Sequence, residues 1–357
     1  MDWPFIKRQT RRDQIIAIDL GRRTTKGVLV QRRGERFSLA DFAFLDAPED
    51  QKAFSAETLG EQLKNMHRAL DGGRTRFISL VLGVNDTLFR QVEVPLLPVA
   101  DLRQMLKFNG KTYLQEDFPG YIFDCTYYAV NVPGKPAEGN KPAGGPQKQK
   151  VLVTGAKKEL VDQLQNAIKL AGLVAHQIVP GVLGPVNAFE SAEPEIFAKE
   201  AVALVDLGFH TSSITFLEAG ELVLNRVVGL GGDRLTTGLS EAMGISYIEA
   251  EGIKVGIPNE VQPQIEALLS PLGRELRASI DFFEHQRDKA VSQVFFSGGA
   301  ARNDFIIRAL QAELIVPCRR WDPTQNLAKE LSPQKAAEIE SVSPQLTVAL
   351  GAALAAF

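Results

Sequence analysis

Apolar and polar residues alternate in two kinds of pattern along the first part of the chain, one typical of buried strands and one typical of helices. Short apolar runs bounded by polar turns predict buried strands, and these are expected at 15–20, 27–30, 37–44 and 77–82. Stretches with apolar residues at every third or fourth position predict helices near 56–70 and 99–113. The first part of the chain therefore predicts an α/β unit that opens with a meander of strands.

The same strand and helix patterns begin again at residue 202, and this repetition predicts a second lobe. Its strands are expected at 202–207, 213–217, 221–228 and 293–296. Its helices are expected near 235–242, 247–255, 265–287 and 303–310. The final stretch, 344–357, is almost wholly apolar and predicts a helix in the core. A chain of 357 residues is long enough for two lobes, each with its own core.

The stretch between the two units predicts a small inserted α+β subdomain at 90–171. After the helix near 99, its elements are expected at 121–132, 150–155, 158–171 and 174–179. Residues 133–150 contain four prolines, four glycines, four lysines and one glutamate. This composition buries too little apolar surface to offset the entropy of ordering the segment, so we expect a flexible loop there.

Charge and cysteine content narrow the classes of function. The 40 Lys and Arg against 43 Asp and Glu give a net charge of −3, so no broad basic surface points to a nucleic-acid partner. Two cysteines, Cys125 and Cys318, and four scattered histidines argue against a disulfide framework and a zinc site. Residues 1–14 form a basic extension without the apolar stretch of a signal peptide, so we expect a cytoplasmic protein.

A turn motif occurs twice, once in each predicted lobe. Asp19-Leu-Gly-Arg-Arg-Thr-Thr25 and Asp206-Leu-Gly-Phe-His-Thr-Ser212 share Asp, Leu, Gly and Thr at the same spacing, 187 residues apart. Each copy follows one buried strand and precedes another, so the repeat is strand–turn–strand. One such turn is typical of an ordinary hairpin, whereas two copies in the same context indicate a duplicated binding element.

The residue types of this motif suit a phosphate group. Glycine lets the backbone approach an anion, successive turn amides form an anion-binding nest, and hydroxyls and a lysine add donors. The aspartates, Asp19 and Asp206, suit Mg²⁺ held through water, because magnesium keeps most of its waters. We therefore expect the two turns to clamp the phosphates of a nucleotide. The predicted residues are Asp19, Gly21, Arg22, Thr24, Thr25 and Lys26 in the first turn, and Asp206, Gly208, Thr211 and Ser212 in the second.

Two further glycine clusters lie at strand–helix junctions of the second half. The first opens a helix whose amides and positive end favour an anion, and it consists of Gly231, Gly232 and Asp233. The second leaves room for a ribose or an adenine against the backbone, and it consists of Gly298, Gly299 and Ala300. Between them, Glu251 and Lys254 share one face of a predicted helix, a spacing that by itself is typical of a solvated charge pair.

The order of these clusters resembles that of the actin-like ATPase superfamily. The turn at 19–26 resembles its phosphate-1 motif, the turn at 206–212 its phosphate-2 motif, and 297–300 its adenosine motif. The inserted unit resembles that of the FtsA-like branch, and within this branch the chain from 15 to 357 is similar to the PilM family of type IV pilus assembly proteins. ATP or ADP with Mg²⁺ is then the implied cofactor, with Glu251 and Lys254 against the nucleoside.

This resemblance also implies an architecture. We expect an actin-like α/β fold, with two lobes around a nucleotide cleft and a small α+β subdomain inserted in the first lobe. The expected division is a first-lobe core at 15–89 and 172–200, the insertion at 90–171, a second lobe at 201–343 and a terminal helix returning to the first lobe at 344–357.

The chain departs from the superfamily at positions that affect hydrolysis. Arg22 and Arg23 follow the first glycine, where Ser or Thr is usual, and Phe209 and His210 replace small residues of the second turn. Hydrolysing relatives commonly place a water-orienting acid or amide in the connecting segment 172–189. In this chain the segment contains no Asp or Glu, and its only amides are Gln177 and Asn187. Because phosphoryl transfer depends on a positioned nucleophile, we expect nucleotide binding with slow or absent hydrolysis, and we assign no catalytic residue.

By the same resemblance, the protein is expected to be an adaptor of a type IV pilus or type II secretion machine. It would bind the N-terminal cytoplasmic tail of an inner-membrane PilN-like protein, in a groove between the first-lobe core and the insertion, and reach the membrane through that partner. Contact with the pilus motor ATPases and self-association are also implied. Two alternatives stay open: a sugar-type small-molecule kinase, and an FtsA-like membrane-associated filament protein of cell division.

Overall fold

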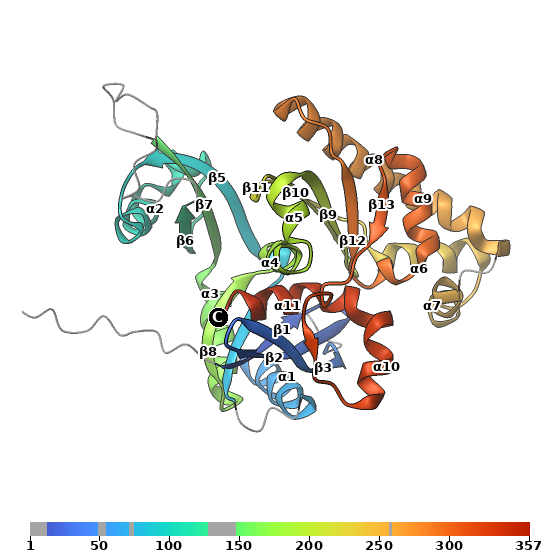
Figure 1. Ribbon diagram of the computed structural model, residues 1–357, viewed down its shortest axis with the longest axis horizontal. Helices are drawn as coiled ribbons and strands as arrows, with labels where there is room; N and C mark the ends of the chain where they lie inside the picture. The colour runs from blue at the N-terminus through green and yellow to red at the C-terminus, as the bar shows by residue number, and fades with distance from the viewer. Residues whose placement is uncertain (1–12, 49–54, 71–74, 128–147, 257–258) are drawn as a thin grey trace, which may run out of the picture.

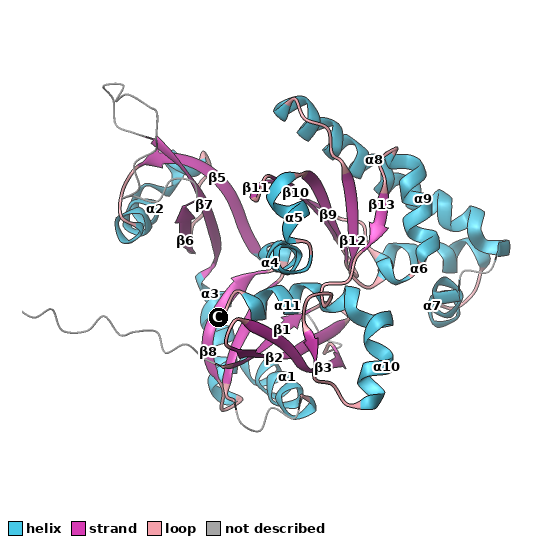
Figure 2. Cartoon of the chain, in the orientation of Figure 1, coloured by secondary structure: helices cyan, strands magenta, loops and turns pink. Residues whose placement is uncertain are grey.

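Two β-sheets with helices on their faces form the two lobes, and a third, smaller sheet extends from the first lobe (Figure 1 and Figure 2). The computed structural model describes residues 13–48, 55–70, 75–127, 148–256 and 259–357. Nearly all of the extension predicted at 1–14 and of the loop predicted at 133–150 therefore lies outside the described residues. Within the described ranges, no helix combines the length and the apolar character needed to cross a bilayer.

The first lobe is built on a six-stranded sheet with the order β14-β3-β2-β1-β4-β8. Its strands are β1 (Gln14–Leu20), β2 (Thr24–Arg33), β3 (Arg36–Asp46), β4 (Phe77–Leu82), β8 (Val174–Pro180) and β14 (Ala328–Lys329). The first three form the antiparallel meander that the apolar runs predict, and β4 and β8 continue the sheet in parallel beyond β1.

Helices cover both faces of this sheet, which is why its central strands are apolar on both sides. On one face, α1 (Ala56–Ala69) and α3 (Lys158–Leu170) pack against Ile16 and Ile18. On the other face, α10 (Pro333–Val342), the 3₁₀ turn η5 (Ser343–Leu346) and α11 (Thr347–Leu354) pack against Ile15 and Ala17. Successive residues of β1 thus enter two different cores, as the alternation of a strand requires. The second lobe predicted at 201–343 is therefore too long at its end, because β14 and α10 belong to the first lobe.

The second lobe is built on a five-stranded sheet with the order β11-β10-β9-β12-β13. Its strands are β9 (Ala201–Leu207), β10 (Ser212–Glu218), β11 (Glu221–Val228), β12 (Gln293–Ser297) and β13 (Cys318–Arg320). The accompanying helices are α6 (Gly232–Met243), α7 (Tyr247–Gly256), η3 (Asn259–Val261), α8 (Gln262–Arg287), η4 (Ala300–Arg302) and α9 (Asp304–Leu314).

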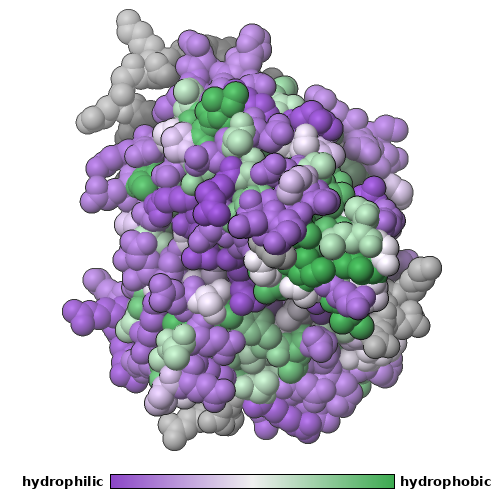
Figure 3. All heavy atoms as spheres, turned by 90° about the vertical axis from the view of Figure 1, so that its right-hand side faces the viewer, coloured by the Kyte–Doolittle hydropathy of each residue, from purple (hydrophilic) through white to green (hydrophobic). Residues whose placement is uncertain are grey.

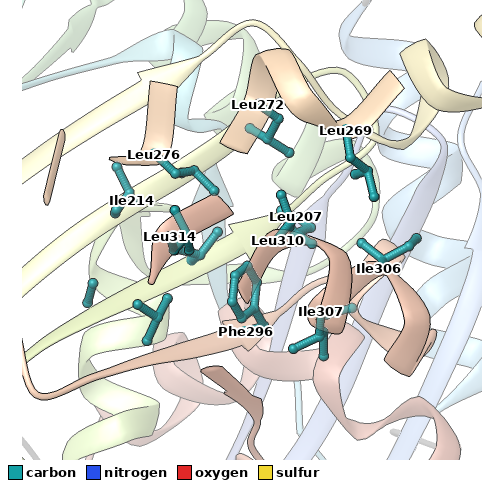
Figure 4. Packing of buried hydrophobic residues seen from close by; sticks show 14 of the residues in the cluster. Leu207, Ile214, Leu269, Leu272, Leu276, Phe296, Ile306, Ile307, Leu310 and Leu314 are labelled. Atoms are coloured by element: carbon teal, nitrogen blue, oxygen red, sulfur yellow. The ribbon is translucent and has the colours of Figure 1, made fainter. Parts of the chain in front are cut away.

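The core of the second lobe lies between this sheet and the helices α8 and α9 (Figure 4). Phe296 of β12 and Leu207 of β9 meet Leu272 of α8 and Leu310 of α9 in one continuous cluster. The outer side of this lobe is mainly polar with a group of apolar side chains (Figure 3), and Ile248 of α7 is among the exposed apolar residues.

A helix between the two sheets contacts both lobes. Phe189 of α4 (Leu183–Ala192) packs edge-on against Phe295 of β12, with ring centroids 4.7 Å apart, and against Trp321 at 5.2 Å. The same helix packs along α11 of the first lobe, and α5 (Pro194–Lys199) then leads into β9. The chain therefore passes from one lobe to the other through a well-packed connection.

In its described part, the inserted subdomain is a three-stranded antiparallel sheet with the order β5-β7-β6, packed against a helix. Its elements are η1 (Val84–Asp86), β5 (Thr87–Pro95), α2 (Val99–Leu114), β6 (Tyr121–Tyr127) and β7 (Lys148–Lys157). The prediction that the helix at 158–171 and the strand at 174–179 complete this unit is wrong, because α3 packs against α1 and β8 pairs with β4. Periodicity identifies a helix but not the sheet that it covers.

Candidate functional site

The two repeated turns have the same backbone geometry. A Cβ on Gly21 would lie 2.5 Å from the carbonyl oxygen of Thr24, and one on Gly208 would lie 2.6 Å from the carbonyl oxygen of Thr211. Side-chain carbons do not approach backbone oxygens so closely, so each turn requires glycine. Beyond each turn, the Asp-bearing strand pairs in parallel with a further strand, β4 for β1 and β12 for β9. The duplication therefore extends from the sequence to the sheet topology.

A cavity of about 1000 Å³ lies between these turns and is lined by both lobes. The predicted residues that line it are Asp19, Gly21, Arg22, Thr24, Lys26, Asp206, Gly208, Thr211, Gly232, Glu251, Lys254, Gly298, Gly299 and Ala300. The fold thus brings together side chains and turns that the sequence places almost 300 residues apart. Four predicted residues are not among the lining residues, namely Thr25, Ser212, Gly231 and Asp233.

Two of those four are buried residues whose hydroxyls form hydrogen bonds that support the turns. Thr25 is buried, and its hydroxyl accepts a hydrogen bond from Gln62 Nε2 of α1 at 3.1 Å. Ser212 is also buried, and its hydroxyl donates to the carbonyl oxygen of Leu230 at 2.7 Å. Both hydroxyls fix the position of a turn, and neither residue lines the cavity as the predicted phosphate contacts require.

The start of α6 holds the second turn in place. The amide of Gly232 donates to the carbonyl oxygen of Gly208 at 2.9 Å, and the amide of Asp233 donates to that of Phe209 at 2.8 Å. These two amides are therefore not the open anion donors that the sequence predicts. Glycine is needed at Gly231 because a Cβ there would lie 2.4 Å from the carbonyl oxygen of Phe209.

Lys26 pairs with the aspartate of its own turn, Asp19, and interacts through charge with Asp206 of the second turn. Its Nζ is 2.8 Å from Asp19 Oδ2. Burial lowers the pKa of Lys26, but the charge and hydrogen bond of Asp19, together with the charge of Asp206, outweigh burial and raise the pKa above 10.5. Burial raises the pKa of Asp206, against the attraction of Lys26 and a 3.0 Å hydrogen bond from Ser297 Oγ. The charge of Lys26 thus acts on the carboxylates of both turns, and it contacts that of Asp19 directly.

This set of groups fits a magnesium ion that keeps its waters. In the part of the chain that the structure describes, no three Asp, Glu, His or Cys side chains gather into a metal site, so a full protein coordination shell is not built there. Asp19 and Asp206 instead present two carboxylates to one cavity. Few carboxylates and many waters are what Mg²⁺ accepts.

Glu251 and Lys254 of α7 form a network with the start of α6. Lys254 Nζ donates to Glu251 Oε2 at 2.7 Å, to Thr236 Oγ1 at 2.7 Å and to the carbonyl oxygen of Gly232 at 3.1 Å, so its three protons have three acceptors. Burial raises the pKa of Glu251, but hydrogen bonds from Lys254, Thr236 and Arg23 hold it below its usual value. Lys254 is itself buried, so the pair is not the solvated charge pair that its spacing alone would indicate.

The cavity also contains residues that the sequence did not single out. Three of them follow the predicted adenosine motif in the sequence, namely Arg302, Asn303 and Ile306. Their position just after Ala300 is the one sequence feature that could have indicated them. Arg320 reaches it from β13, which pairs in parallel with β12. Because that pairing is long-range, no local pattern indicates it.

The amides of the connecting segment are engaged away from the cavity. They belong to Gln177 and Asn187. Gln177 Nε2 donates to Ser79 Oγ at 2.9 Å, and Asn187 Nδ2 donates to the carbonyl oxygen of Gly351 at 3.5 Å. Neither amide lines the cavity, so both serve packing against the first-lobe sheet and α11.

A family model described as "Type IV pilus assembly protein PilM" matches residues 138–357, which is more than half of the chain. The chain belongs to the PilM family. The resemblance drawn from the order of the motifs is thereby confirmed. A chain of the PilM-PilN type IV pilus biogenesis complex is 20% identical and superposes with a TM-score of 0.82, over 97% of this chain and 99% of that chain.

More distant likenesses concern the fold alone. The ethanolamine utilization protein EutJ from Carboxydothermus hydrogenoformans superposes with a TM-score of 0.54 at 14% identity, over 96% of this chain and 90% of that chain. MreB5 of Spiroplasma citri, bound to ADP, superposes with a TM-score of 0.51 at 11% identity, over 88% of this chain and 93% of that chain. The predicted actin-like fold is therefore confirmed for this PilM-family chain.

A curated relative matches over a shorter stretch. The cell division protein FtsA of Bacillus subtilis (strain 168) is 31% identical over 103 residues, which is 29% of this chain. The match spans 22% of the length of FtsA.

Proposed function

We propose that this PilM-family protein is a nucleotide-binding adaptor of a type IV pilus or type II secretion machine, with ATP or ADP and Mg²⁺ in the cavity between the lobes. The observation that carries the proposal is the pair of turns of equal geometry, one from each lobe, on one cavity of about 1000 Å³. The hydroxyls of Thr24 and Thr211 and the ammonium of Lys26 are suited to phosphate oxygens. The glycines at 298–299 leave room for the nucleoside.

Magnesium is proposed to lie near Asp19 and Asp206, through water. When bound, the ion would neutralise phosphate charge that the two carboxylates alone would repel. Lys26 would then be shared between Asp19 and the phosphates.

Slow or absent hydrolysis is the second part of the proposal. Gln177 and Asn187 are engaged in packing, and the segment 172–189 contains no Asp or Glu. Without a side chain of this segment to orient the attacking water, the rate acceleration that comes from positioning this water is lost. The bound nucleotide instead shifts the equilibrium between lobe conformations.

The partner is proposed to be the N-terminal cytoplasmic tail of an inner-membrane PilN-like protein, which would hold the adaptor at the inner face of that membrane. Among the described residues, β7 is central in the inserted sheet and β5 and β6 are its edges, while β8 is an edge of the first-lobe sheet. An extended tail can add to such an edge through main-chain hydrogen bonds, with apolar pockets reading its side chains. Contacts with the motor ATPases and self-association stay predictions from the resemblance.

The partner assignment is tested with a synthetic tail. Fluorescence anisotropy of a labelled peptide with the first residues of the PilN-like protein is expected to show saturable binding to the full chain. A peptide of the same sequence with alternate backbone nitrogens methylated is expected not to bind, because strand addition needs those donors. Equal binding of a scrambled peptide would contradict the assignment. Binding of Mg-ATP, measured separately by calorimetry, tests the nucleotide site.

A further inference from the structure

Arg23 crosses the cleft from the first turn to the second lobe. Its Nη1 lies 2.6 Å from Glu251 Oε1 of α7. Its guanidinium carbon lies 5.5 Å from the centroid of the Phe209 ring, which belongs to the second turn. Arg23, Phe209 and Glu251 all line the cavity. One side chain of the first lobe thus contacts two residues of the second lobe inside the cleft itself.

The neighbouring arginine behaves differently. Arg22 lies 3.7 Å from Asp86, which belongs to η1 of its own lobe. The two adjacent arginines therefore have separate tasks, since Arg22 contacts the base of the insertion and Arg23 bridges the lobes. No local pattern in the sequence tells them apart, because both replace small residues of the same turn.

The bridge is built so that Arg23 can leave while its partner stays satisfied. When Arg23 moves away, Glu251 Oε2 keeps the ammonium of Lys254 at 2.7 Å and the hydroxyl of Thr236 at 2.5 Å. The Arg23 side chain is 45% exposed, so it is able to change partner without first breaking out of a packed core. Phosphate oxygens attract a guanidinium at least as well as a carboxylate does, and accept two parallel hydrogen bonds from it.

We propose that Arg23 and Glu251 form a latch that joins the two lobes in the absence of nucleotide, and that the phosphates of a bound nucleotide take Arg23 from Glu251. The exchange rests on the proposed nucleotide site, whereas the latch itself does not. The ligand class that releases the latch is a nucleoside di- or triphosphate, since adenosine carries no group that competes for a guanidinium. The closed arrangement is then held first by the protein and afterwards by the nucleotide.

The latch is tested by measuring the distance between the lobes. Spin labels are attached at Glu61→Cys on α1 and Glu266→Cys on α8, both exposed positions. The native thiols are expected to react slowly, because Cys125 is buried and burial raises the pKa of both thiols, that of Cys318 to about 12. Distances between the labels are measured by pulsed electron–electron double resonance for the otherwise native chain, Arg23→Gln, Glu251→Gln and the double variant. Arg33→Gln, which breaks an exposed 3.0 Å pair with Glu330 inside the first lobe, is the matched control.

Without nucleotide, Arg23→Gln and Glu251→Gln are each expected to raise the population with longer distances about fivefold, as loss of one partly exposed ion pair allows. The double variant is expected to add nothing further, and Arg33→Gln to change nothing. Unaltered distances in Arg23→Gln, or a full additional change in the double variant, would overturn the latch. Thermal unfolding of each variant separates lobe opening from loss of fold.

The exchange is tested by ligand addition to the labelled native chain and Arg23→Gln. Mg-ADP is expected to bind Arg23→Gln more weakly than the native chain, because the variant has no guanidinium to offer the phosphates, while adenosine is expected to bind both chains equally. If Mg-ADP binds the native chain and Arg23→Gln equally, or adenosine distinguishes between them as Mg-ADP does, the phosphate exchange is contradicted. If Mg-ADP binds to no variant, the proposed nucleotide site fails while the measured latch stands.

Discussion

Lys26 and Asp19 face each other across the β1–β2 ladder, with Lys26 Nζ 2.8 Å from Asp19 Oδ2. Their side chains are only 20% and 12% exposed. A pair this protected from water tolerates the loss of one member poorly, because the other charge is left without a partner. The turn proposed to hold phosphate is therefore also a source of stability.

Lys26→Met is expected to lower the free energy of unfolding by about 2 kcal/mol, since Asp19 and Asp206 are left to repel each other in a partly buried site. Urea denaturation measures the loss. Asp19→Asn added to Lys26→Met is expected to recover part of this loss. The double-mutant cycle then gives the interaction free energy between Lys26 and Asp19. A loss below about 0.5 kcal/mol, typical of an exposed pair, would show that the geometry does not stabilise the fold.

The contribution of Lys26 to stability is expected to depend on pH only in alkaline solution. The folded state raises its pKa above the ordinary 10.5, so the folded state binds the proton more tightly than the unfolded state. The contribution is complete below that value and is lost as the pH rises through the folded pKa. Urea midpoints of the native chain and of Lys26→Met should converge above about pH 10.5. Convergence already near neutral pH would contradict this.

Asp206→Asn is expected to stabilise the free protein at neutral pH by about 1 kcal/mol, while weakening magnesium-dependent nucleotide binding. Burial raises the pKa of Asp206 in the folded state above the ordinary 3.8. Its favourable contribution to folding stability is therefore complete below about pH 3.8 and is lost as the pH rises through the folded pKa. Asparagine keeps an acceptor for Ser297 without the charge. Asp162→Asn, on the exposed side of α3, is the control. A lower melting temperature for Asp206→Asn would be the contrary result.

Gly208→Ala is expected to open the second turn, because the new methyl group would lie 2.6 Å from the carbonyl oxygen of Thr211. We expect a loss of about 1–3 kcal/mol in stability and at least tenfold weaker nucleotide binding. Gly256→Ala, whose new methyl group would meet no atom within 4 Å, is the matched control and should be neutral. Equal behaviour of the two variants in thermal unfolding and calorimetry would refute the role given to the turn.

Elements with strong local periodicity could be predicted closely, and those that depend on long-range pairing could not. The strand at 77–82 and the strand at 221–228 have the predicted bounds, because a compact apolar run between polar turns leaves little choice. The strands β13 and β14 are only three and two residues long and exist through partners far along the chain. Local pattern carries no signal for them.

The candidate site shows the same division. The repeat identified the turns around Gly21 and Gly208 because identical backbone geometry imposes identical residues. The pairing of Arg23 with Glu251 could not be anticipated, since it depends on how the lobes meet. The amides of α6 failed as open donors for a related reason, because the second turn packs on them.

The measurement that tests the central claim most directly is calorimetric titration of the purified chain with Mg-ATP, followed by phosphate release from the same sample. We expect one nucleotide bound per chain, binding strongly reduced in Lys26→Met, and phosphate release far below one turnover per minute. Absence of binding in the native chain would contradict the nucleotide site. Release of phosphate at several turnovers per minute, abolished by Asp206→Ala, would contradict the account of an adaptor that binds nucleotide without turning it over.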